Sequence, residues 1–66
     1  MTAAEWCYIA GGTIKEHKRG GAVSILRVET LIRLGEEWRD CGYISCPYEL
    51  NLLQELKELN QLMRKE

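Results

Sequence analysis

Apolar residues recur at helical spacing along the last third of the chain. Leucine and methionine follow one another at steps of four and three residues, at Leu52, Leu56, Leu59 and Met63. This spacing places the four side chains on one face of a helix. Pro47 suits the first turn of that helix, because proline lacks the N–H that would be left unpaired there. The pattern predicts an amphipathic helix over residues 46–64, whose apolar face has to pack against another element.

A second helical pattern precedes the first and predicts a helix over residues 24–41. Its apolar positions, three and four residues apart, are Ile25, Val28, Leu31, Ile32, Gly35 and Trp38. Gly42 is expected to end this helix as a left-handed residue. Gly35 interrupts the apolar side chains and indicates close packing against a neighbouring helix or against Trp6. Because residues 42–45 form a short connector, the two helices are expected to be antiparallel neighbours.

The first part of the chain supports two interpretations. Residues 5–10 are rich in aromatic and β-branched side chains, and Gly11-Gly12 separates them from Thr13-Ile14-Lys15, which is typical of a β-hairpin with a primed turn. Alternatively, Thr2 and Glu5 match a capping box, and residues 3–10 and 13–19 would form two short helices. We favour a hairpin over about residues 5–18. The predicted fold is therefore α+β, mostly α, with this hairpin packed on the antiparallel helical hairpin in one domain over residues 1–66.

Composition and charge limit the cellular compartment and the classes of function that we expect for this protein. The chain has 66 residues, a formal net charge of −1 and three cysteines. A chain of this size is marginally stable without a disulfide, a metal or a second subunit. An odd number of cysteines argues against a secreted disulfide framework, and no apolar run approaches the roughly 18 residues of a membrane span. We expect a cytoplasmic protein with no membrane association and no overall basic field for nucleic acid.

Few residues offer metal or catalytic chemistry. The soft ligands are Cys7, His17, Cys41 and Cys46, and their spacing matches no zinc motif. His17 has no neighbouring nucleophile in the sequence, and no phosphate-binding or nucleophile-elbow motif is present. We therefore expect no enzyme activity and no cofactor.

The surplus of apolar residues in so short a chain favours a role in binding. The lead hypothesis is a small protein–protein interaction module, a homodimer that regulates or inhibits another macromolecule. Its expected partner-binding residues are Trp6, Tyr43, Tyr48, Leu52, Leu56, Leu59 and Met63. The alternative is a small DNA-binding regulator that uses the basic segment Lys15, His17, Lys18 and Arg19. Nucleic acid is the less favoured partner, because these cations are few.

Overall fold

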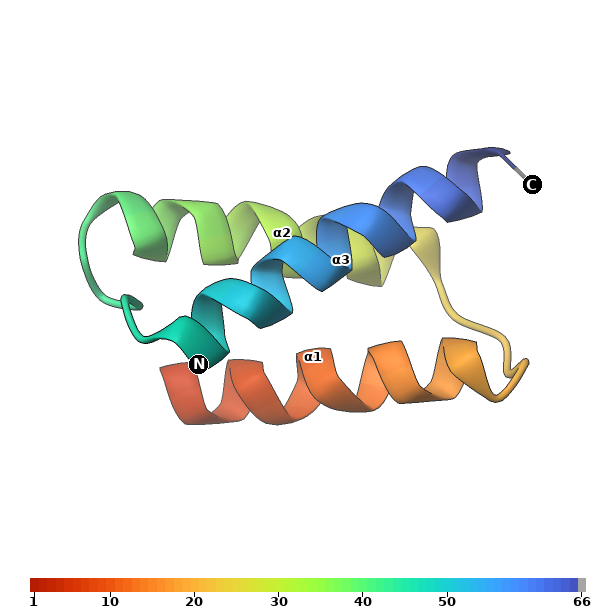
Figure 1. Cartoon of the computed structure of the whole chain (residues 1–66), viewed down its shortest axis with the longest axis horizontal. Coiled ribbons are helices and arrows are strands. Elements are labelled where there is room, and N and C mark those ends of the chain that lie inside the picture. The colour runs from red at the N-terminus through yellow and green to blue at the C-terminus, as the bar shows by residue number, and fades with distance from the viewer. Residues whose placement is uncertain (66) are drawn as a thin grey trace.

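Three α-helices joined by two loops make up the computed structural model, which describes residues 1–65 (Figure 1). Helix α1 spans Ala3–Lys18, α2 spans Ile25–Asp40 and α3 spans Pro47–Lys65. Each helix reverses direction relative to the one before it, and α3 crosses in front of α2 at an angle (Figure 1). The helices therefore enclose one shared apolar core, in which α3 contacts both other helices.

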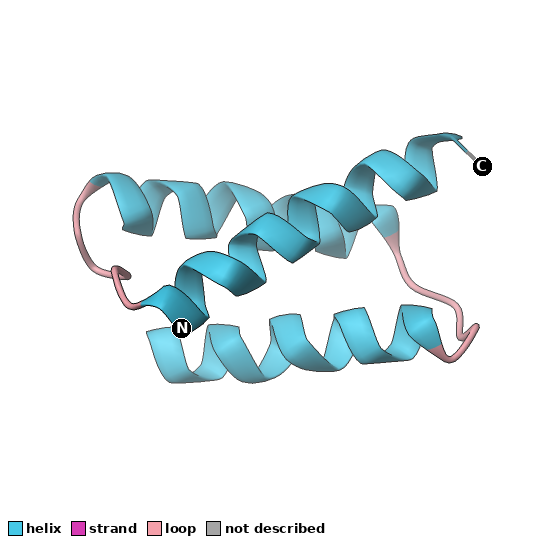
Figure 2. Cartoon of the chain, viewed as in Figure 1, coloured by secondary structure: helices cyan, strands magenta, loops and turns pink. Residues whose placement is uncertain are grey.

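The predicted β-hairpin is wrong. The segment 5–18 belongs to a single helix, and residues 1–65 contain no strand (Figure 2). The alternative of two short helices also differs from the structure, because α1 runs through Gly11 and Gly12 without a break.

Local and tertiary interactions explain why α1 is helical. Thr2 and Glu5 form the capping box: the Glu5 N–H donates to Thr2 Oγ1 at 3.2 Å, and the Thr2 N–H donates to Glu5 Oε1 at 2.9 Å. The residues of α1 that are buried recur at helical steps and are Trp6, Ala10, Thr13 and Ile14. The Thr13 hydroxyl donates to the Ile9 carbonyl at 2.8 Å, which satisfies this polar group inside the helix. Burial of this face offsets the cost of two mid-helix glycines, about 1 kcal/mol each.

The helical hairpin of α2 and α3 lies within two residues of its predicted bounds. Gly42 adopts a φ of +82°, and the Tyr43 N–H donates to the Trp38 carbonyl at 2.8 Å, so α2 ends in the expected left-handed turn. Ile44 is only 1% exposed and fixes the loop against the core. At the start of α3, the Ser45 and Cys46 N–H groups donate to Glu49 Oε1. The connector is thus held by its own hydrogen bonds as well as by burial.

Trp6 is the centre of the core. Its side chain is fully buried, and its indole Nε1–H donates to the Leu31 carbonyl at 3.0 Å. Gly35 of α2 lies directly against it: a Cβ at this position would stand 2.7 Å from Trp6 Cζ2 and 2.9 Å from Leu53 Cδ1. The expectation that Gly35 permits close packing against Trp6 and a neighbouring helix is confirmed, with α1 and α3 both meeting α2 at this point.

The leucines of α3 face inward within one protomer. The buried members are Leu52, Leu53, Leu56 and Leu59. Ion pairs at the edge of this interface include Lys57–Glu36 at 2.8 Å and Arg64–Glu29, both of which link α3 to α2. Such partly exposed pairs each contribute at most about 1 kcal/mol, so the leucine contacts dominate the packing. Within residues 1–65, no helix is both long enough and apolar enough to cross a membrane.

Candidate functional site

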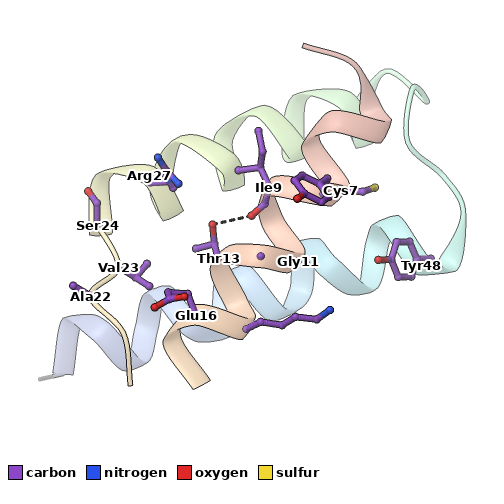
Figure 3. A pocket seen from close by; sticks show the side chains of 13 residues that line it. Cys7, Ile9, Gly11, Thr13, Glu16, Ala22, Val23, Ser24, Arg27 and Tyr48 are labelled. Carbon is purple, nitrogen blue, oxygen red and sulfur yellow. Dashed lines mark hydrogen bonds between the residues drawn. The ribbon is translucent and has the colours of Figure 1, made fainter. Parts of the chain in front are cut away.

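A surface groove of about 810 Å³ follows the outward side of α1 (Figure 3). We call it the α1 groove. It is lined by the middle of α1, the α1–α2 loop, the start of α2 and one residue at the start of α3; the residues that matter most below are Tyr8, Gly12, Lys15, Arg27 and Tyr48. Tyr48 lies at one end of the groove, and Ser24 and Arg27 lie toward the other (Figure 3). Three segments distant in sequence therefore meet at one surface.

Part of the lining of the α1 groove is helix backbone without side chains. Gly11 and Gly12 both line it, and a Cβ at either position would find no heavy atom within 4 Å. The protein's own packing therefore does not require a glycine at either position. An approaching group can come closer to the helix axis here than at any position that bears a side chain.

Two tyrosines border the groove and face water. Tyr8 of α1 is 84% exposed and Tyr48 of α3 is 64% exposed. Tyr8 follows the buried Trp6 by two residues, which on a helix turns it to nearly the opposite side. Half-buried Ile9 and Val23 add apolar surface between the rim and the core. The groove is therefore amphipathic, with aromatic rings at its edge.

The charge of the groove is positive. Lys15 and Arg27 are exposed lining residues, and neither has a carboxylate within ion-pair distance among residues 1–65. Glu16 is the one acidic residue of the lining, and it pairs with Arg19. Two cations are thus left without a partner from the described chain.

The candidate metal ligands do not converge. Cys7 lies near the start of α1, and His17 lies ten residues further along the same helix, about 15 Å away along the axis. His17 instead lines a smaller hollow of about 270 Å³ between α1 and α3. Cys41 and Cys46 are exposed free thiols at the two ends of the α2–α3 connector. In the described part of the chain, no three His, Cys, Asp or Glu side chains come together to hold a metal ion.

Cys7 is poorly suited to act as a nucleophile. Its thiol is half-buried, and this burial is the main cause that raises its pKa, followed by the negative charges of Glu49 and Cys46. A raised pKa keeps the thiol protonated at neutral pH, and the thiolate is the reactive form. Cys7 is therefore best described as a packing residue at the edge of the groove.

The residues predicted to bind a partner are dispersed in the structure. Trp6, Leu52, Leu56 and Leu59 lie in the core and are unavailable to a partner in this conformation. Met63 is half-buried against the core, and Tyr43 packs edge-on against Trp38 with ring centroids 5.0 Å apart. Only Tyr48 of the seven lines the α1 groove.

Sequence analysis missed Tyr8, Gly11, Gly12 and Arg27 as groove residues. The signal for Tyr8 was present in its position two residues after Trp6, but it could be used only once α1 was known to be a helix. Helical spacing within α1 could not have predicted Arg27, because the path of the α1–α2 loop determines which α2 residues lie beside α1.

The predicted basic segment is also divided. Lys15 lines the α1 groove, whereas His17 lines the smaller hollow. Lys18 stands 4.0 Å from Glu55, and Arg19 pairs with Glu16. Lys15, Lys18 and the C-cap residue Arg19 are three and four residues apart and lie on one side of the end of α1, whereas His17 points to nearly the opposite side from Lys15.

Comparisons with protein-family models, with curated proteins and with solved structures find no match to this chain. A functional interpretation therefore has to start from the α1 groove, where aromatic rings, bare backbone and two unpaired cations come together.

Proposed function

We propose that this protein is a non-enzymatic protein–protein interaction module that regulates or inhibits another macromolecule by docking it in the α1 groove. One observation carries the proposal: two strongly exposed tyrosines, Tyr8 and Tyr48, border a groove that is lined in part by the bare backbone of Gly11 and Gly12. Neither feature contributes to the three-helix core. Tyrosine is enriched at protein interfaces, because it brings a large apolar surface and a hydroxyl at little conformational cost.

The shape of the groove favours a helix as the bound element. The α1 groove follows a helix and is closed on one side by the α1–α2 loop (Figure 3). A partner helix laid along α1 would meet no side chain at Gly11 and Gly12, so the two backbones can approach more closely than the usual 8–10 Å between helix axes. Helix-in-groove docking uses an amphipathic helix with its apolar side turned inward.

The proposal does not include self-association. The expectation of a homodimer rests on Leu50, Leu53 and Leu62, which flank the leucine stripe of α3 and would leave apolar surface that one partner helix cannot wholly cover. In the structure Leu53 is buried but Leu62 is 50% exposed, so one protomer covers only part of this surface, and the homodimer stays a prediction.

Site-specific photo-crosslinking tests the proposal. A photoreactive phenylalanine derivative replaces Tyr48 in the groove or, in a matched control, Leu26, which is 71% exposed on α2 and does not line the groove. In extract of the cells that make the protein, we expect the probe at position 48 to form a discrete adduct that position 26 does not form.

Competition identifies the surface responsible. Unlabelled wild-type protein should abolish the adduct, whereas the Gly12→Gln variant should compete poorly. Glutamine favours a helix over glycine, and its side chain would occupy space in the groove. Equal competition by Gly12→Gln, or the same adduct from both probe positions, would show that the α1 groove is not the docking surface.

A further inference from the structure

We propose that the segment docked in the α1 groove is acidic: an amphipathic helix of another protein that places carboxylates against Lys15 and Arg27. This inference rests on the proposed function of the groove and adds the chemistry of its partner.

Lys15 and Arg27 are the two cations of the groove lining, and ion pairs within the described chain neutralise neither of them, as is also true of Arg33 outside the groove. Five other basic residues each lie within 4.0 Å of a carboxylate, namely Lys18, Arg19, Arg39, Lys57 and Arg64. Lys15 and Arg27 have no such partner among residues 1–65, although both lie in the same groove. The local charge is therefore positive on a chain whose formal net charge is −1. Opposite charge on the partner would be attracted to this groove in particular.

The two cations come from different elements and share the groove with apolar side chains. Lys15 belongs to α1, and Arg27 belongs to the first turn of α2, across the α1–α2 loop. Ile9 and Val23 line the same groove and are half-buried. A partner helix with an apolar face and acidic flanks matches this arrangement: its apolar side covers Ile9 and Val23, and its carboxylates reach the cations.

The groove suits carboxylates on a peptide better than the phosphates of nucleic acid. The N–H groups of Gly11 and Gly12 lie inside α1 and are committed to the helix, so they form no nest for a phosphate. Two cations also release too few counterions for appreciable nucleic-acid affinity at physiological salt. The experiment below also measures binding of duplex DNA, which would contradict the acidic-peptide proposal.

A peptide selection tests the inference. A displayed library of random 16-residue peptides is selected against the wild-type protein, against Lys15→Glu/Arg27→Glu, and against Arg33→Glu as a control. Arg33 is an exposed α2 residue without an ion pair among residues 1–65 and does not line the groove. Affinities of the enriched peptides and of a duplex DNA probe for these three proteins and for the Gly12→Gln variant are measured by fluorescence anisotropy at low and physiological salt.

We expect acidic peptides with apolar residues at helical spacing from the wild-type selection. The Lys15→Glu/Arg27→Glu double variant should bind these peptides about tenfold more weakly, or weaker still. Each exposed ion pair contributes up to about a fivefold change in affinity, and the reversed charges add repulsion. Arg33→Glu should change affinity less than about twofold. The Lys15→Glu/Arg27→Glu protein should select basic peptides instead, which shows that the variant is folded and that the groove sets the charge preference.

Other outcomes separate this inference from the proposed function. Peptides that lose binding in Gly12→Gln but show no acidic excess would overturn the acidic partner and leave the docking groove intact. Absence of any peptide that depends on Gly12 would overturn both. Tighter binding of the DNA probe than of the selected peptides would overturn the acidic partner in favour of nucleic acid.

Discussion

Replacing Gly35 by alanine adds one methyl group at the most tightly packed point of the core. The new Cβ would lie 2.7 Å from Trp6 Cζ2 and 2.9 Å from Leu53 Cδ1, well inside van der Waals contact. Overpacking of this kind costs about 1–3 kcal/mol, whereas alanine gains about 1 kcal/mol of helix propensity over glycine. Because both neighbours are themselves buried and cannot swing into solvent, we expect the upper part of this cost, about 2–3 kcal/mol, and hence a net loss of about 1–2 kcal/mol in the free energy of unfolding.

Gly12→Ala is the matched control for this substitution. It makes the same chemical change in the middle of a helix, at a position where the Cβ meets nothing within 4 Å. We expect this variant to be more stable than wild type by about 0.5–1 kcal/mol. If Gly35→Ala lowers the free energy of unfolding and Gly12→Ala raises it, the difference gives the cost of overpacking at Gly35 separately from the gain in helix propensity.

Urea unfolding followed by circular dichroism measures both effects. Each change of 1 kcal/mol in the free energy of unfolding should also shift the melting temperature by about 4–8 °C in a domain of this size. Combining Gly35→Ala with Leu53→Ala should cost less than the sum of the two single losses, since the smaller side chain makes room for the methyl group. If Gly35→Ala raised stability as much as Gly12→Ala does, the close approach of α1, α2 and α3 at this point would be refuted.

Two further stability predictions concern the core and the cap of α1. Leu56 is fully buried, so Leu56→Ala should cost about 2–5 kcal/mol in urea unfolding, and a loss below about 1 kcal/mol would place this side chain outside the core. The hydrogen bond from the Thr2 N–H lowers the pKa of Glu5, so its contribution to stability is present at neutral pH and is lost as pH falls below about 4. Glu5→Gln should therefore be less stable than wild type at pH 7 by a margin that shrinks toward pH 2. A margin that stays constant over that range would contradict the role assigned to the Glu5 carboxylate.

The two C-terminal helices could be predicted from the sequence because their signals agree with one another. Apolar periodicity, Pro47 at the start of α3 and Gly42 after α2 all indicate the same boundaries. The first segment carries signals that conflict. Gly11-Gly12 is typical of a hairpin turn, whereas the Thr2 capping box and the spacing from Trp6 to Ala10 to Ile14 indicate a helix. Tertiary packing decides between them, because only a helix places these three side chains together on the α2–α3 hairpin.

The partner-binding surface could be predicted less well, for a related reason. The leucines that flank the α3 stripe were expected to exceed what one partner helix can cover, and the first segment was interpreted as a hairpin rather than as another helix. Once α1 is a helix, it covers Leu56 and Leu59 in the same protomer. Tyr48 is the one predicted partner-binding residue that lines the groove, and its neighbours there come from segments whose placement depends on the tertiary fold.

The same helix that carries Trp6 on its inner side carries Tyr8, Gly12 and Lys15 on its outer side. Attachment of α1 to the other two helices and occupation of its outer surface are therefore linked equilibria. A ligand that binds only the docked form would raise its apparent stability by about 2.7 kcal/mol at a free concentration one hundred times its dissociation constant. In a chain of 66 residues, such a gain is a large share of the whole folding free energy, so the resistance of this protein to proteolysis would follow the abundance of its partner.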